Sequence, residues 1–184
     1  MSISVHVTPS ETTERDYKLA SAVAPHVSLD SIFLLSISAK MNVPHDTVVE
    51  SMANGTLPAS IKWRHVKELS QDALAVGVRL DFLVEFGKVD KIAKSNLELT
   101  CSYMLDYSLD SPPPDDHREE LLDAFAKVNA VYNAWPYLRE LVQNTFVRMS
   151  LPPPVVPVFR ARPLPKEKQN DVNVQPAPAE GKTG

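Results

Sequence analysis

The stretch that decides the fold is residues 74–109, LAVGVRLDFLVEFGKVDKIAKSNLELTCSYMLDYSL. Large apolar side chains occupy almost every second position in residues 74–86 and again in residues 97–109. Because successive side chains of a β-strand point to opposite faces of a sheet, this alternation predicts two strands with one buried face each. The polar, lysine-rich residues 87–95 between them predict a hairpin connection, which makes the two strands antiparallel partners.

Two further strands are expected before this pair. Residues 32–39, IFLLSISA, form an apolar and β-branched run whose length suits a strand better than a helix. Residues 61–65 alternate more weakly between apolar or aromatic and basic side chains. The connection between them, residues 43–59, contains turn-forming prolines and an Asn-Gly pair, with room for one helical turn at residues 46–52.

The hydrophobic period changes after the three prolines at 112–114, which stop a sheet because proline cannot donate to a ladder. Asp115 or Asp116 is then placed to cap a helix with an acidic first turn. Apolar side chains recur at helical spacing over residues 121–149, and Pro136 is expected to kink or split this helix. The sequence therefore predicts an α+β fold, with a four-stranded antiparallel sheet packed against a long, proline-interrupted helix.

The two ends differ in composition from the middle of the chain. Residues 1–26 are rich in Ser, Thr and charge, and they predict a loosely held N-terminal extension with one short helix around residues 17–23. Residues 161–184 have too few large apolar side chains to offset their ordering entropy, which predicts a disordered tail. One domain is expected between them, over residues 27–160.

Composition limits the possible partners and the compartment. The formal net charge is −4 and no Lys or Arg stripe is visible, so nucleic acid is not an expected partner. A single cysteine, Cys101, excludes a disulfide framework within one subunit and fits a reducing compartment. The N-terminus lacks the pattern of a signal peptide, and no apolar run approaches the roughly 18 residues of a membrane span. We therefore expect a cytoplasmic protein that does not insert into membranes.

The sequence gives no pattern typical of catalysis. Its 5 histidines are scattered without metal-ligand spacing, and its 5 glycines form no phosphate-binding loop. Cys101 lies within an apolar alternation, where a thiol is usually a small core residue. We expect no catalytic residues, no metal site and no cofactor, and so a protein that is not an enzyme.

Residues 133–142, NAWPYLRELV, and residues 148–153, RMSLPP, resemble the SecB family of chaperones. In that family an aromatic-Pro-Tyr-x-Arg-Glu segment lies in the long helix, and a proline-containing segment follows at similar spacing. The order of strands and helices agrees over residues 27–157. We expect structural roles for the motif residues, which are Trp135, Pro136, Tyr137, Arg139, Glu140, Pro152 and Pro153.

The resemblance implies an ATP-independent holding chaperone that binds unfolded or preprotein-like polypeptides in apolar grooves. It implies a homotetramer, a dimer of dimers, in which sheets extend across one interface and long helices form another. The strand candidate at residues 32–39 is then the edge that pairs with another subunit. The client-binding residues implied by mapping the family's groove are Val48, Val49, Met52, Ile61, Trp63, Val156 and Phe159.

One region departs from the familiar export chaperones of this family, which continue with an acidic second helix beside the groove. Residues 155–163, VVPVFRARP, are too proline-rich and basic for such a helix. They are closer to divergent SecB-like proteins, including those that guard the antitoxin of a toxin-antitoxin pair. The family implies the export motor SecA as a partner, and this ending argues against it. Two alternatives stay open: a dedicated chaperone of one client such as an antitoxin, and a carrier of small apolar ligands.

Overall fold

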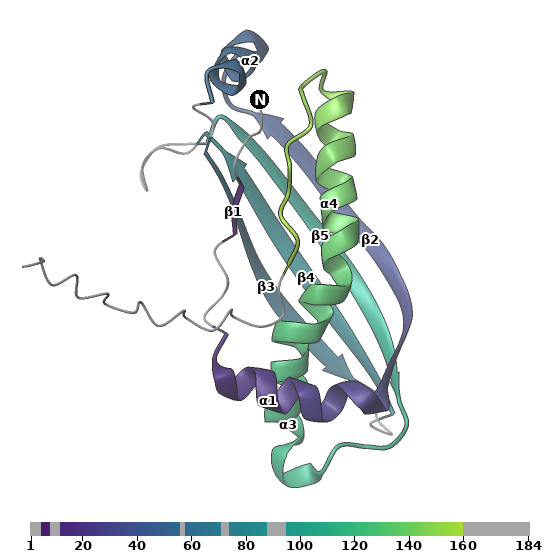
Figure 1. Ribbon diagram of the computed structural model, residues 1–184. Coiled ribbons are helices and arrows are strands. Elements are labelled where there is room, and N and C mark those ends of the chain that lie inside the picture. Colours follow the sequence, from purple (N-terminus) through teal and green to yellow (C-terminus); the bar gives the residue numbers. More distant parts are fainter. Residues whose placement is uncertain (1–4, 8–11, 56–57, 71–73, 88–94, 160–184) are drawn as a thin grey trace, which may run out of the picture.

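The structure is a computed structural model that describes residues 5–7, 12–55, 58–70, 74–87 and 95–159. A sheet is covered on one face by a long helix (Figure 1). A short strand that the sequence did not lead us to expect, β1 Val5–Val7, pairs in parallel with the first residues of β3. The four expected antiparallel strands are β2 Val27–Met41, β3 Ala59–Leu69, β4 Ala75–Phe86 and β5 Leu97–Leu109.

The strands lie in the order β1-β3-β4-β5-β2, so β2 forms one edge of the sheet. The antiparallel pairing expected within residues 74–109 is confirmed, with Phe82 opposite Cys101 and Val84 opposite Leu99. All four of these side chains are buried. The pairing of β2 with β5 contains two register shifts, which the sequence pattern did not reveal.

The long helix consists of α3 Arg118–Phe125, a π-helical segment Ala126–Ala130, and α4 Val131–Arg148. α4 continues through Pro136 as one helix, so the expected split does not occur at that residue. Pro136 is exposed, and water can therefore bond the carbonyl that its missing N–H leaves without a helical donor. The regular α-helical winding is interrupted earlier, at the π-helical segment.

The start of α3 also differs from the prediction. The chain forms a 3-10 turn at Asp115–His117 directly after the prolines, and α3 begins only at Arg118. Its N-cap residue is His117, whose side chain makes no capping hydrogen bond. The predicted cap by Asp115 or Asp116 is therefore wrong, because the tight turn uses both residues before the α-helix starts.

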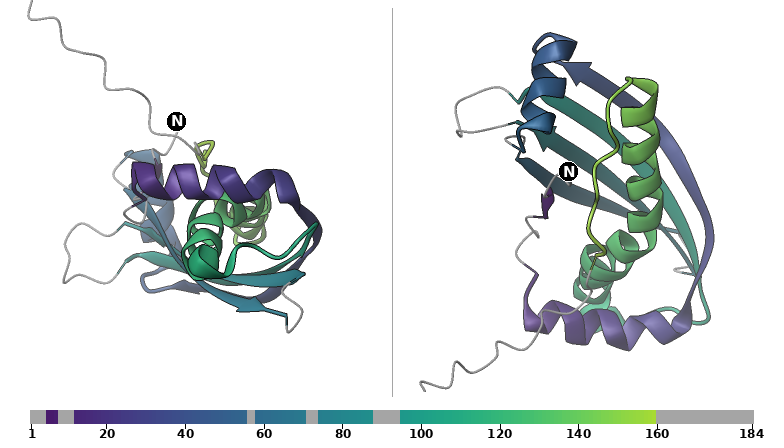
Figure 2. Two further views of the ribbon diagram at one scale, coloured as in Figure 1. Left: turned by 90° about the horizontal axis from the view of Figure 1, so that it is seen from below. Right: turned by 45° about the horizontal axis from the view of Figure 1, so that its top comes forward.

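A left-handed turn ends α4. Ser150 has a φ of 56°, and the N–H of Leu151 donates to the carbonyl of Phe146 over 2.9 Å, which is the bond that closes a Schellman motif. The chain then runs back beside α4 as far as residue 159, without a helix and with a single β-bridge residue at Val155 (Figures 1 and 2). This agrees with residues 155–163 being too proline-rich for a helix, as far as the structure describes them. We call residues 154–159 the C-terminal strap.

Two shorter helices, α1 Glu14–Val23 and α2 His45–Ala53, complete the described fold. α2 confirms the helical turn expected in the connection between the first two long strands. α1 begins earlier than expected because Thr13 and Asp16 cap its first turn reciprocally.

The N-terminal region is not loosely held where the structure describes α1. Ala20 of α1 is buried in a small cluster with Ala124 and Val128 of the long helix. The predicted tail at residues 161–184 lies outside the described residues. The division into extension, domain and tail stays a prediction.

Candidate functional site

Four aromatic rings from different parts of the chain meet between β3 and α4. Trp63 of β3 lies 6.0 Å from Trp135 of α4 and 5.8 Å from Phe159 of the strap, measured between ring centroids. Phe82, which pairs with Trp63 across the sheet, lies 6.5 Å from it. Rings at these separations attract one another beyond the simple burial of their surface. We call the three rings contributed by the sheet and α4, which are Trp63, Phe82 and Trp135, the aromatic site, and Phe159 of the C-terminal strap packs into it.

The C-terminal strap occupies this site as an extended segment. The ring of Phe159 lies 5.1 Å from that of Trp135, and the indole Nε1–H of Trp135 donates to the carbonyl of Pro157 over 2.8 Å. Val156 is fully buried, whereas Val158 is 69% exposed. The strap is thus held by two side chains and one backbone carbonyl, as a short peptide in a groove would be.

The structure brings only some of the expected client-binding residues together. Trp63 and Phe159 touch and are partly buried, and Val156 of the strap is buried in the core. Ile61, two residues before Trp63, is buried. On α2, Val48 and Met52 face the core and Val49 is partly buried against it.

The motif residues fall into two groups. Trp135 is buried and contacts the strap, which supports a structural role. Arg139 is partly buried, and its Nε finds no acceptor among the described residues. The exposed members of the motif are Pro136, Tyr137, Glu140, Pro152 and Pro153.

The contribution of Phe82 to the aromatic site was not foreseen. The alternation places its side chain on the buried face of the sheet, but only the register of β3 with β4 sets it opposite Trp63. The contact between Trp135 and the strap depends on the turn after Ser150, which reverses the chain. The proline run before the strap was the one signal in the sequence that could have indicated this reversal.

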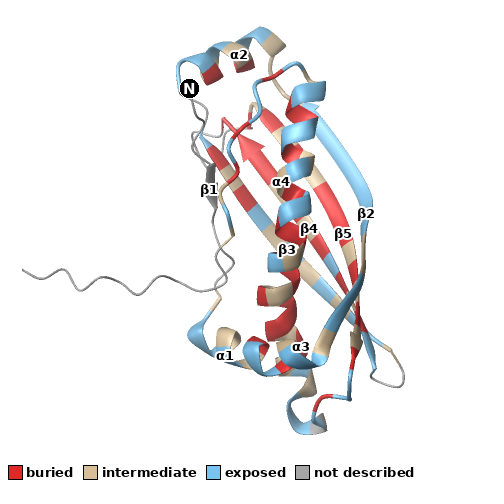
Figure 3. Ribbon diagram, turned by 45° about the vertical axis from the view of Figure 1, so that its right-hand side comes forward, coloured by how far each residue is buried: buried red, intermediate tan, exposed pale blue. Residues whose placement is uncertain are grey.

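A second apolar surface lies on the other side of α4, along β2. Large side chains that a core would normally cover are exposed there, and Figure 3 shows most of β2 in the colour of exposed residues and none of it as buried. A cleft of about 240 Å³ separates this strand from α4, with Leu34 on one wall and Tyr137 and Leu141 on the other. The exposed apolar residues of the strand are Leu29, Phe33, Leu34, Leu35 and Ile37, and of these Phe33 pairs with Met104 on the face that the long helix leaves uncovered.

The face of the sheet that the long helix leaves uncovered is mainly polar. Asp81 accepts hydrogen bonds there from Arg64 over 2.8 Å, Arg79 over 2.9 Å and Ser102 over 2.6 Å. Burial alone would raise the pKa of Asp81, but these three donors hold it below its usual value. A face of this kind offers little to an apolar segment.

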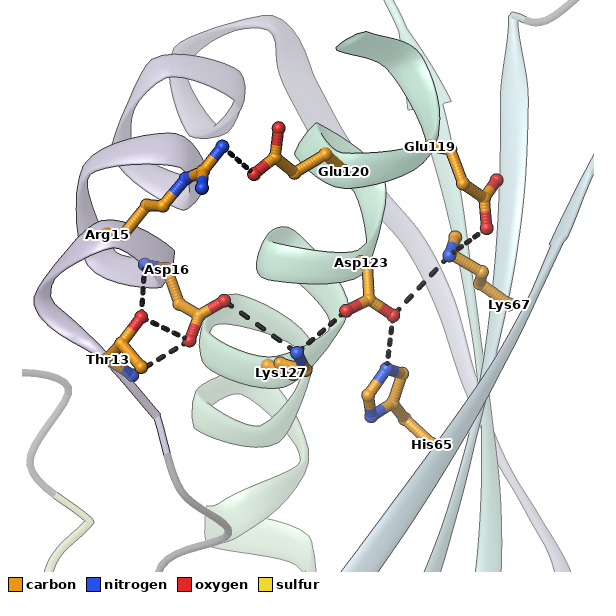
Figure 4. A network of polar contacts seen from close by, with 9 residues as sticks. All are labelled: Thr13, Arg15, Asp16, His65, Lys67, Glu119, Glu120, Asp123 and Lys127. Atoms are coloured by element: carbon orange, nitrogen blue, oxygen red, sulfur yellow. Dashed lines mark hydrogen bonds and ion pairs between the residues drawn. The ribbon is translucent and has the colours of Figure 1, made fainter.

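A network of charged side chains fastens α1 and the long helix to β3 (Figure 4). Asp123 accepts from Lys127 over 2.8 Å and from His65 over 3.0 Å, and Lys127 also lies 3.7 Å from Asp16 of α1. Burial raises the pKa of Asp123, but the hydrogen bonds from Lys127 and His65 outweigh it and hold the pKa well below the usual range. The network pairs every one of these charges, as a structural fastening does.

Nothing in the described residues assembles a reactive centre of the kinds considered above. Cys101 is buried, and burial, followed by the nearby Asp81 carboxylate, raises the pKa of its thiol to about 12, as suits a core residue. The described residues contain no group of three or more His, Cys, Asp or Glu side chains that could hold a metal ion. None of the described helices is long and apolar enough to cross a membrane.

Comparisons with known proteins rest on structure alone, because no family model and no curated protein sequence matches the chain. The SecB-like chaperone of Mycobacterium tuberculosis, solved in complex with a ChAD peptide from the HigA1 antitoxin, superposes with a TM-score of 0.63 at 17% identity. The match covers 79% of this chain and 99% of that chain. A protein of unknown function from Streptococcus agalactiae matches with a TM-score of 0.36 at 9% identity, over 71% of this chain and 96% of that one. The first likeness confirms the α+β fold class and shows that the fold is SecB-like.

Proposed function

We propose that this chain, which has a SecB-like fold, is a subunit of an ATP-independent chaperone that holds unfolded or preprotein-like polypeptides and keeps them soluble. The observation that carries the proposal is the aromatic site, which already holds an extended segment of the chain's own polypeptide. It does so through ring contacts and a bond to a backbone carbonyl. Neither kind of contact depends on one particular sequence, as a chaperone with many clients requires.

The proposed client surface follows the β3 side of α4. Apolar area that a client removes from water there contributes roughly 25 cal/mol per Å², and the ordering of the client opposes it. Several such sites in one assembly would raise the affinity through effective concentration. Of the expected client-binding residues, we propose that the partly exposed Val49 and Trp63 contact a client. Val48, Met52 and Ile61 are buried in the core beneath this surface, and Val156 and Phe159 belong to the strap that covers it.

The proposal includes a homotetramer built as a dimer of dimers. β2 is a sheet edge whose apolar side chains are exposed, with Leu35 at 52% and Ile37 at 46%. A long apolar edge strand tends to pair with another chain, and pairing with the β2 of a second copy would cover it. Each chain would then be one half of a dimer, and two such dimers would form the tetramer.

A narrower version of the function is a chaperone dedicated to one client such as an antitoxin. Two observations favour it: the solved SecB-like protein carries an antitoxin peptide, and a strap stands here where the export chaperones have a helix. A carrier of small apolar ligands has less support, because buried side chains fill the space between α4 and the middle strands β4 and β5. We do not propose SecA or nucleic acid as partners, nor a cofactor, and we propose the cytoplasm as the compartment.

The test is suppression of aggregation without nucleotide. The purified chain, at one tetramer per client, should slow the aggregation of chemically unfolded citrate synthase by severalfold, and an equal mass of serum albumin should not. Light scattering of the same sample should give four times the mass of one chain. An unchanged aggregation rate would contradict the chaperone, and the mass of a single chain would contradict the assembly.

A further inference from the structure

We propose that the C-terminal strap is a displaceable stand-in for a client, so that the aromatic site recognises an extended segment with an apolar side chain followed three residues later by an aromatic one. This inference rests on the proposed function. It adds the kind of client segment that the aromatic site binds. It also adds that the chain's own strap regulates the access of clients to this site.

The contacts of the strap define the pattern that the site recognises. Val156 is buried and Phe159 lies among the rings of Trp63 and Trp135, while Val158 between them is 69% exposed. The carbonyl of Pro157 accepts the hydrogen bond from Trp135. Two side chains at positions i and i+3 and the carbonyl at i+1 are therefore bound, and the side chain at i+2 is free to vary.

The site keeps one donor that the strap does not use. The indole Nε1 of Trp63 is buried and has no hydrogen-bond partner among the described residues. A buried donor without an acceptor costs stability, and the carbonyl of another extended chain could satisfy it. A client that bonds both indoles would fit better than the strap, which bonds only Trp135. This difference gives a client a means of displacing a segment that is tethered beside the site.

The prolines of the strap favour its release. Pro154 and Pro157 have no backbone N–H, so these two residues of the strap cannot donate hydrogen bonds to a neighbouring strand. A client without prolines at these places has donors that the strap lacks. A client can bind only those molecules whose site is open. The apparent affinity for a client is therefore the intrinsic affinity multiplied by the fraction of molecules in which the strap has left the site.

The first experiment loosens the strap in the full-length chain and leaves the walls of the site intact. Phe159→Ala should tighten binding of permanently unfolded, reduced and carboxymethylated α-lactalbumin by about tenfold, because it removes the aromatic anchor that competes with the client. Val158→Ala, next to it on an exposed residue, should leave the affinity unchanged. Unchanged or weaker binding by Phe159→Ala would overturn the proposal.

A peptide experiment separates the strap from the chaperone function. A free peptide of residues 153–160, PPVVPVFR, should bind the Phe159→Ala chain and change the fluorescence of its tryptophans, because both tryptophans of the chain line the site. A peptide with Val156 and Phe159 both replaced by Ser should not. Peptide binding without α-lactalbumin binding by any variant would contradict the chaperone function alone, and no peptide binding would overturn the proposal about the strap.

A third measurement keeps Phe159 in place and does not depend on the fold of that variant. Val158→Cys is labelled with bimane, a dye that tryptophan quenches, while buried Cys101 stays unlabelled. Saturating unfolded α-lactalbumin should raise the bimane emission by about twofold or more, because the dye leaves the two indoles. Unchanged emission at saturation would show that the client binds without moving the strap and would overturn the proposal.

Discussion

The two sides of α4 face the same sheet, yet one is closed and the other is open. On the β3 side, the strap packs Phe159 against Trp63 and Trp135, and Trp135 is only 2% exposed. On the β2 side, Leu35 and Ile37 are about half exposed and a cleft separates the strand from the helix. On the closed side an extended segment of the chain covers the apolar surface, and on the open side no described segment covers the apolar side chains of β2.

The difference follows from what each side can reach within one chain. The turn at Ser150 directs the strap along the β3 side, where Phe159 meets the indoles. At β2 the chain arrives from α1 and continues into α2, so the segments next to the strand in the sequence are used in these helices. A second copy of the chain is therefore the partner that we propose for β2, and a client is the competitor that we propose for the strap.

The largest effect is expected on the closed side, from Trp135→Ala. The substitution removes the buried indole, its ring contacts with Trp63 and Phe159, and the hydrogen bond to Pro157. It should lower the free energy of unfolding by about 3–5 kcal/mol in a urea titration. Tyr137→Ala, on the open side at 44% exposure, should cost less than about 1 kcal/mol. Equal losses would mean that the two sides do not differ in packing.

A smaller effect is expected on the open side, where association and not folding should respond. Ile37→Lys places a charge on the apolar edge and should weaken self-association by about 2 kcal/mol or more, roughly thirtyfold in the dissociation constant. Sedimentation equilibrium measures it. Ser38→Lys is the matched control, because Ser38 pairs with Thr100 on the opposite, polar face. If neither variant changes the mass, β2 is not the edge that joins two copies.

The closed side could be predicted only in part from the sequence. The alternation in residues 74–109 fixes which side chains of β4 and β5 are buried, because a strand has a period of two. It does not fix the register that sets Trp63 opposite Phe82, nor the turn that returns Phe159 to Trp135. Both depend on contacts between residues far apart in the chain, and local propensity does not encode these.

On the open side, the position of β2 at the edge of the sheet was predicted, but the register of its pairing with β5 was not. The family resemblance implied that the strand candidate at residues 32–39 is an edge of the sheet, and β2 is one. The register shifts near Leu29 and Leu34 were not visible, since a bulge leaves the composition of a strand unchanged. Similarly, β1 is only three residues long and carries too short an alternation to be recognised.

Below the aromatic site, the closed side has a second fastening that is polar. Asp123 joins Lys127 of the long helix to His65 of β3, and Lys127 reaches Asp16 of α1 (Figure 4). The side chain of Asp123 is 37% exposed, so solvent and salt screen much of the attraction that lowers its pKa. This fastening should therefore contribute less than the packing of Trp135.

Asp123→Asn should separate the polar fastening from the apolar one by its dependence on pH. Because the folded chain lowers the pKa of Asp123 below its ordinary 3.8, the carboxylate stabilises the fold above about pH 4, and this stability is lost as the pH falls below that value. At pH 7 the variant should lose about 1 kcal/mol in urea unfolding, and the loss should shrink toward pH 3 and in 1 M salt. Asp116→Asn, an exposed carboxylate just before α3, is the control and should change little. If the variant loses the same free energy of unfolding at pH 3 and at pH 7, the effect of Asp123 comes from packing and not from its charge. The polar and the apolar fastening of the closed side would then not differ in kind.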